Sequence, residues 1–213
     1  MFLNDVEEMG RHGWFARGEE TRTDYRICAM SPQSMHAIRA SARYSRAIHA
    51  IAELLAKLKI DAMFVGGAAR SAWMDAEVDG GAIDVLALMN APQRNQLAMM
   101  ASHRGFRVER EELQQAEELD LVPLNFSDAE GEVRVHVLLA SNALYGRMVA
   151  AGQATTIDER SVKIPRAEDL ALMLLMAEDE EAVKHLTSLP EFDLVAFRER
   201  LTSIGLGGEA ANA

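Results

Sequence analysis

The sequence predicts an α+β fold that ends in a helical C-terminal part. A short apolar run over residues 62–65 leads into Gly66-Gly67 and an alanine-rich segment, which is typical of a strand, a tight turn and a helix. Residues 83–88 begin with β-branched side chains and are mostly apolar, as a strand buried on both faces would be. The patterns after residue 142 are helical.

The first part of the chain contains an irregular arm and a long helix. Residues 1–30 are polar and show no sustained period of either helix or strand, so we expect an irregular N-terminal arm. Ser31 and Pro32 are a good N-cap and a good first helical residue, and apolar side chains then repeat at helical spacing. This predicts one long helix over residues 32–59.

The second part alternates strands and helices before it becomes helical. In the last of the predicted strands, valines alternate with Arg134 and His136, which indicates one polar face. The predicted elements are a helix over 92–103, strands over 107–109, 121–126 and 133–139, and helices over 142–151, 167–186 and 192–204. The expected domains are the arm 1–30, an α/β domain over 31–165, C-terminal helices over 166–206 and a frayed tail over 207–213.

Composition restricts the class of protein. The 213 residues are 49% hydrophobic and 26% charged, which suits a globular chain with a substantial core. A formal net charge of -11 argues against DNA and anionic membranes as partners. Cys28 is the single cysteine, so no internal disulfide can form. The N-terminus lacks a secretion signal and no long apolar run follows, so we expect a cytoplasmic protein that does not enter a membrane.

A family resemblance starts from the segment Phe64-Val65-Gly66-Gly67 and the later segment Ile83-Asp84-Val85-Leu86. Together they resemble the head of the nucleotidyltransferase superfamily, which includes the CCA-adding enzymes and the small nucleotidyltransferases of toxin-antitoxin systems. The resemblance extends through the strand 133–139 and the segment 163–170, and it covers residues 36–190. It implies a mixed β-sheet flanked by helices.

The resemblance also implies a chemistry. Nucleotidyl transfer needs two Mg²⁺ ions to neutralise the phosphates and to align the attacking hydroxyl with the leaving pyrophosphate. In the family, two carboxylates separated by one residue on a strand and a third on a neighbouring strand hold these ions. Gly66 and Gly67 would let backbone N–H groups approach a triphosphate. Arg70 would either hold a phosphate oxygen or cap the edge of the sheet.

The sequence keeps the turn but departs from the carboxylate set. The first acid is replaced by Ala82, Asp84 keeps the second position, and His136 stands where the third acid is expected. One carboxylate with an imidazole is a poor site for Mg²⁺ and would hold a softer ion such as Mn²⁺ or Zn²⁺ weakly. If the protein is active, Mg²⁺ or Mn²⁺ is the expected cofactor. Acids that lie near but not at the family positions are Asp75, Glu77, Asp79 and Glu132.

Each of these residues also has a structural interpretation. A glycine pair after a strand is often only a tight connection. Asp84 needs a partner in its apolar strand, and an ion pair with Arg70 or Arg134 would serve as well as a vestigial metal site. His136 is equally consistent with a hydrogen-bonded histidine of the core or of a cleft.

A basic stripe is a candidate interaction surface. Arg39, Arg43 and Arg46 share one face of the predicted helix 32–59. The stripe is either a solvated helix face, which is the more common explanation, or a surface for an acidic partner, for RNA, or for the acidic stretches of this chain, 109–120 and 178–181. Self-association through the arm and this helix would make the protein an interaction module.

The sequence thus leaves two main functional hypotheses. One is a catalytically impaired nucleotidyltransferase-like protein that binds a nucleotide, with NTP as the expected ligand, or a protein partner. The other is an active metal-dependent enzyme that transfers NMP from an NTP to a protein, RNA or small-molecule acceptor, with Asp84 and His136 as site residues.

Overall fold

The computed structural model describes residues 37–74, 77–78, 80–108 and 120–205. These residues form two compact units. One unit runs from Met35 to Leu170, and the described part of the other is residues 171–205. The predicted arm 1–30 and tail 207–213 lie outside the described residues. None of the helices in these ranges has the length and apolar character that a membrane crossing requires.

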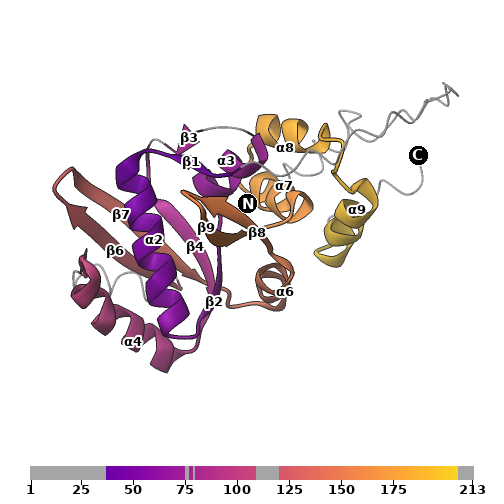
Figure 1. Ribbon diagram of the computed structural model, residues 1–213. Helices are drawn as coiled ribbons and strands as arrows, with labels where there is room; N and C mark the ends of the chain where they lie inside the picture. Colours follow the sequence, from indigo (N-terminus) through magenta and orange to yellow (C-terminus); the bar gives the residue numbers. More distant parts are fainter. Residues whose placement is uncertain (1–36, 75–76, 79, 109–119, 206–213) are drawn as a thin grey trace, which may run out of the picture. The chain divides into compact units, whose positions relative to one another are not determined.

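A mixed sheet of five strands organises the larger unit (Figure 1). In spatial order the strands are β2 (Asp61–Phe64), β4 (Ile83–Leu88), β7 (Gly131–Leu139), β6 (Leu121–Asp128) and β5 (Phe106–Arg107). Strands β4 and β7 are parallel, and the other neighbouring pairs are antiparallel. The predicted α+β fold with a mixed sheet is confirmed.

The two faces of this sheet differ in polarity. Ile83, Val135 and Leu124 lie in one row across β4, β7 and β6, and all three are buried. The next row, which points to the opposite face, contains the half-exposed Asp84 and His136. Because successive strand residues alternate between faces, the polar side chains gather on the face of Asp84, although Leu86 on that same face is buried as well.

Helices of the larger unit cover and connect these strands. Helix α2 (Ala42–Lys57) and helix α4 (Ala91–Ala101) contact each other as well as β7 and β6, respectively. At the start of α4, the Asn90 side chain accepts from the Gln93 backbone N–H and the Gln93 side chain accepts from the Asn90 N–H, which is a capping box. A 3-10 turn, η1 (Ser102–Arg104), ends the α4 segment. Helices α3 (Gly66–Met74) and α6 (Ala143–Ala151) contact β4.

The beginning of the predicted helix 32–59 is wrong. Residues 32–36 lie outside the described residues, and Arg39–Ala40 form a short strand, β1, parallel to β3 (Glu77–Val78). The buried Ser71 hydroxyl accepts from the Arg39 N–H at 3.0 Å and donates to the Arg39 carbonyl at 3.2 Å. These long-range bonds override the local helical period, so α2 begins only after Ser41.

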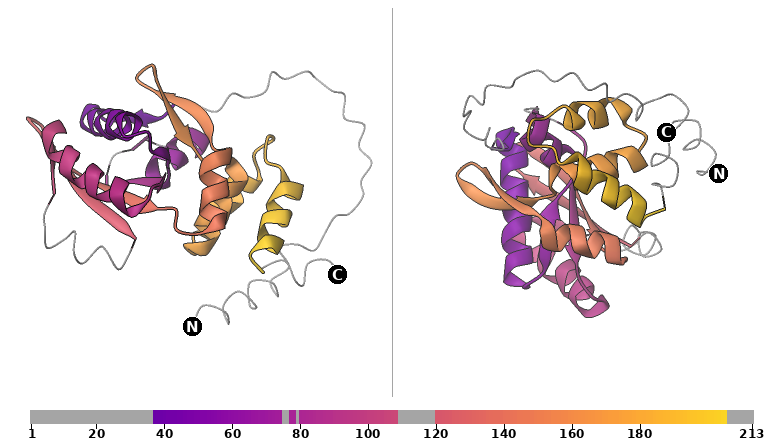
Figure 2. Two further views of the ribbon diagram at one scale, coloured as in Figure 1. Left: turned by 90° about the horizontal axis from the view of Figure 1, so that it is seen from below. Right: turned by 90° about the vertical axis from the view of Figure 1, so that its right-hand side faces the viewer.

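A two-stranded ribbon was missed by the sequence analysis. Strands β8 (Gln153–Ile157) and β9 (Arg160–Ile164) form an antiparallel hairpin that is a sheet of its own (Figure 2). Asp158 and Glu159 turn the chain with φ of 43° and 66°. The Asp-Glu pair hides this hairpin, because asparagine and glycine are the usual residues for such angles.

The predicted helix 167–186 is two helices. Helix α7 (Ala167–Met176) ends before Glu178, whose φ of 60° is left-handed, and α8 (Glu180–Thr187) follows. Asp179 caps α8 by accepting from the Ala182 N–H. Helix α9 (Leu194–Ser203) is the last described helix and agrees with the prediction for 192–204.

Candidate functional site

Asp84 and His136 meet on the polar face of the sheet. They are register partners on the parallel strands β4 and β7, so their side chains leave the sheet side by side. His136 Nδ1 lies 3.1 Å from Asp84 Oδ1, and the two side chains are 30% and 34% exposed. From the sequence, Arg70 and Arg134 were the expected ion-pair partners of Asp84. In the structure, Asp84 contacts His136.

This pair has a defined hydrogen-bond polarity. An ionised carboxylate can only accept, so the proton of the bond belongs to His136 Nδ1. In the neutral ring, Nε2 is then the acceptor and is available to a ligand. Asp84 therefore orients the imidazole of His136, and Nδ1 is already engaged.

Gly66 makes room for the Asp84 carboxylate. Its φ is +54°, and a Cβ built on it would lie 2.7 Å from Asp84 Oδ2. A Cβ on Gly67 would meet nothing within 4 Å. The space beside the first glycine of the turn is thus filled by the chain's own carboxylate, whereas the space beside the second glycine is open.

The start of α3 is the predicted phosphate cradle. Helix N-termini attract anions because their first N–H groups have no partner within the helix. Here Asp84 places a negative charge beside that N-terminus, so a phosphate must approach a carboxylate unless a cation lies between them. Arg70 lies on α3, one helical turn after Gly66, and is half-buried.

A carboxylate cage around Asp84 is not visible in the described residues. No group of three His, Cys, Asp or Glu side chains comes close enough there to hold a metal ion. Glu132 lies on β7 four residues before His136, which is roughly 13 Å along a strand. Glu77 is an exposed residue of β3, and Asp75 and Asp79 lie outside the described residues.

The polar face continues beyond the pair of Asp84 and His136. Arg107, Asn125 and Arg134 form one row across β5, β6 and β7, on the same face as His136. Sequence analysis noted Arg134 but missed Arg107 and Asn125. Asn125 sits in an apolar run, and only the register of β6 with its neighbours reveals which face it joins.

Two surface hollows open elsewhere than at the pair of Asp84 and His136, and Arg107 of the polar face borders the first of them. One, of about 620 Å³, is lined by residues between Ala98 and Val108, and the other, of about 370 Å³, lies between α2 and β9. In the second, Arg160 on the rim pairs with Glu53 at 2.8 Å. Neither hollow is lined by Asp84 or His136.

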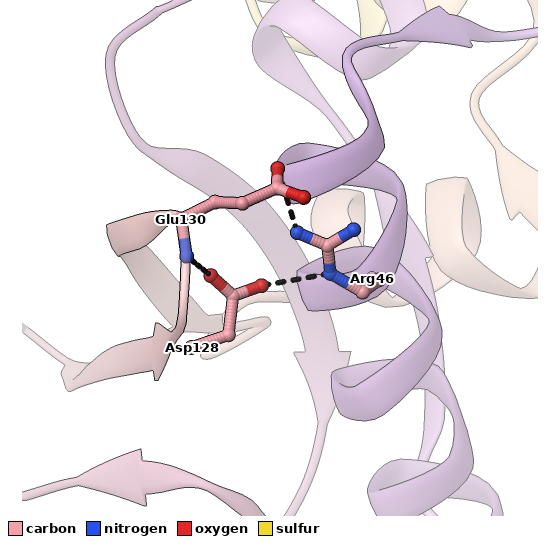
Figure 3. A network of polar contacts seen from close by, with 3 residues as sticks. All are labelled: Arg46, Asp128 and Glu130. Carbon is pink, nitrogen blue, oxygen red and sulfur yellow. Dashed lines mark hydrogen bonds and ion pairs between the residues drawn. The ribbon is translucent and has the colours of Figure 1, made fainter.

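The predicted basic stripe of three arginines on one helix is only partly present in the structure. Arg39 lies in β1, so only Arg43 and Arg46 share helix α2. Arg46 Nε lies 2.7 Å from Asp128 Oδ2, and its Nη2 lies 2.8 Å from Glu130 Oε2 (Figure 3). Arg46 thus has acidic partners at the β6–β7 turn, which the sequence did not indicate, whereas most of the predicted counterpart 109–120 lies outside the described residues. The bonds from Arg46 and from the Glu130 N–H hold the pKa of Asp128 below its ordinary value.

Comparisons with known proteins find a likeness in structure but none in sequence. No family model matches the sequence, and no curated protein matches it. The structure matches the crystal structure of an antigenic nucleotidyltransferase-like protein from Paracoccidioides brasiliensis. The TM-score is 0.47 at 14% sequence identity, and the match covers 79% of this chain and 89% of that chain.

Proposed function

We propose that this chain is a catalytically impaired nucleotidyltransferase-like protein that binds a nucleotide at the Gly66-Gly67 turn. The observation that carries the proposal is the hydrogen bond between Asp84 and His136. It joins the single acid retained from the expected set to the histidine that replaces the third acid. A protein partner is the other ligand class that the sequence leaves open for an inactive chain.

The chemistry of the pair supports impaired transfer. Mg²⁺ prefers an octahedron of oxygen ligands and is usually held by carboxylates and phosphates. Here one carboxylate oxygen is engaged by His136 Nδ1, and Ala82 has a methyl group where another carboxylate is expected. Two metal ions would have too few anionic ligands to be held firmly.

One observation favours the competing function, a metal-dependent transferase. Asp84 Oδ2 is not the oxygen that contacts His136, and it lies beside the turn at Gly66. Asp84 would hold a single Mg²⁺ or Mn²⁺ through this oxygen, and the ion would supply charge neutralisation for a triphosphate. NMP would then pass from an NTP to a protein, RNA or small-molecule acceptor.

ATP binding in the wild type and in Asp84→Asn separates the two functions. For an impaired binder, removal of the carboxylate charge strengthens ATP binding without divalent cations, by about threefold to tenfold. Calorimetry with and without Mg²⁺ or Mn²⁺ measures the affinity, and a coupled assay measures pyrophosphate release. Glu132→Gln is the matched control, because it removes the same charge from the same face at a distance.

The outcomes are distinct. We expect ATP binding without pyrophosphate release, with tighter cation-free binding in Asp84→Asn and little change in Glu132→Gln. Release that depends on a divalent cation and is lost in Asp84→Asn would establish the competing function. A wild-type protein that binds no ATP under any of these conditions would refute nucleotide binding.

A further inference from the structure

We propose that Arg107, Asn125 and Arg134 form a binding site for a single phosphate group on the polar face of the sheet. The three residues are cross-strand neighbours on β5, β6 and β7, in the register Arg107 to Asn125 and Asn125 to Arg134. Because directly opposed residues point to the same face, the two guanidinium groups flank the amide of Asn125.

The spacing of this row fits a phosphate. Neighbouring strands are about 4.8 Å apart, so the two arginines leave the sheet roughly 10 Å from each other. Arginine side chains are long enough to bend toward a group between them, and each guanidinium can offer two parallel N–H donors to phosphate oxygens. One phosphate above Asn125 is therefore within reach of both.

The two arginines of the row have no carboxylate partner among the described residues. Arg107 and Arg134 are both exposed, and among the described residues no carboxylate lies within ion-pair distance of either. Glu132, which shares their face, instead accepts from the Ser127 hydroxyl at 3.4 Å. Two like charges held on either side of one strand without an anion between them repel each other, and a bound phosphate reduces this repulsion.

The middle residue is the second observation that points to a ligand. Asn125 is only 8% exposed, and none of the hydrogen bonds between described residues involves its side chain. The polar atoms of this amide are not fully shielded from solvent, so they remain accessible to a ligand. Its N–H₂ group can donate to a phosphate oxygen held between the arginines, which would satisfy it.

The ligand we expect is a small phosphomonoester rather than a nucleic acid. The chain has a net charge of -11, which repels a polyanion but costs little for one local phosphate. Arg134 precedes His136 by two residues, roughly 7 Å along β7, so the bound group would lie close to the pair of Asp84 and His136. The site is separate from the glycine turn and does not depend on nucleotide binding there.

Inorganic phosphate is the probe that tests this site in the full chain. Titration followed by ³¹P NMR, at constant ionic strength maintained with chloride, gives the affinity of the wild type. Arg107→Gln and Arg134→Gln should each weaken binding about tenfold, since each removes a pair of charge-assisted hydrogen bonds. Arg198→Gln, which removes the same charge from an exposed position of α9, should leave binding unchanged.

Three results would overturn the proposal. These are no saturable phosphate binding to the wild type, equal weakening by the control Arg198→Gln, and tighter binding of single-stranded RNA than of phosphate at equal phosphate concentration. Circular dichroism of each variant confirms that the exposed substitutions leave the fold intact. Phosphate binding in a protein that binds no ATP would refute the proposed function and leave this site standing, and ATP binding without this site would do the reverse.

Discussion

Gly66 and Asp84 restrict each other's choice of side chain. The left-handed φ of +54° at Gly66 strains any residue with a Cβ, and that Cβ would also lie 2.7 Å from Asp84 Oδ2. The neighbouring Gly67 has neither restriction, because its surroundings are open and its φ is not left-handed. Two adjacent glycines in one turn therefore have different physical reasons to be there.

This difference predicts opposite effects of two alanine substitutions. Gly66→Ala should lower the free energy of unfolding by roughly 2 kcal/mol, from backbone strain and displacement of the carboxylate. Gly67→Ala should be neutral or stabilising by up to about 1 kcal/mol, because alanine has less freedom to lose in a helix. Urea unfolding of both variants measures this. Equal destabilisation would show that the turn does not have the described geometry.

The candidate site was predictable residue by residue, but not as an arrangement. Asp84 and His136 could be chosen from the sequence because they stand where the resemblance to the nucleotidyltransferase superfamily expects carboxylates. That they touch depends on the register of β4 with β7, which pairs segments about fifty residues apart and has no local signal. The same applies to Asn125, whose face is set by its neighbours in the sheet.

At the scale of elements, β1 depends on one buried hydroxyl. Ser71 is 0% exposed and bonds to both the N–H and the carbonyl of Arg39. Ser71→Ala should cost about 1–3 kcal/mol, because the Arg39 N–H and carbonyl lose their hydrogen bonds to this hydroxyl. Ser102→Ala is the control, since the Ser102 hydroxyl bonds to the Met99 carbonyl at an exposed site. Thermal or urea unfolding compares the two, and a loss no larger in Ser71→Ala would contradict the role of this hydroxyl.

The ion pairs of Arg46 with Asp128 and Glu130 connect α2 to the β6–β7 turn, and we call this connection the Arg46 tie. Its contribution to stability should depend on pH. The hydrogen bonds from Arg46 and from the Glu130 N–H lower the pKa of Asp128, so the folded state binds fewer protons than the unfolded chain. The tie is therefore present above the ordinary carboxyl pKa of about 4 and is lost as the pH falls below it.

Arg46→Gln tests this tie. The variant should be less stable than the wild type at pH 7, and the difference should shrink as the pH falls below about 4. Urea midpoints at several pH values measure it, and high salt should reduce the difference at pH 7 because the groups are exposed. A difference that keeps its size in acid would contradict the assignment.

The sequence predicted helices and strands well where neighbouring residues alone determine them. The strands around residues 62–65 and 83–88 and the helix near 92–103 follow from apolar period and turn residues, and the structure has them within a few residues. The start of α2 was missed because Ser71 and β3 draw Arg39–Ala40 into a strand. The ribbon of β8 and β9 was missed because its turn, Asp158-Glu159, lacks the usual residues.

For the larger unit as a whole, the centre of the sheet should be the most stable part. Strands β4 and β7 each have a neighbour on both sides, whereas β5 is a two-residue edge strand and the β8–β9 ribbon is a separate sheet. Amides that exchange only after extensive opening are found in such central strands. Hydrogen exchange followed by mass spectrometry should therefore show the slowest exchange in β4 and β7. Equally slow exchange in the ribbon would contradict this order.

The fit of Gly66 against Asp84 also links the histories of two positions far apart in the chain. A descendant that keeps the acid at position 84 must keep the glycine at position 66. In a descendant with a shorter side chain at position 84, the steric restriction on position 66 disappears and only the left-handed φ still favours glycine. Among diverged copies of this gene, alanine or serine should enter position 66 only after position 84 has changed.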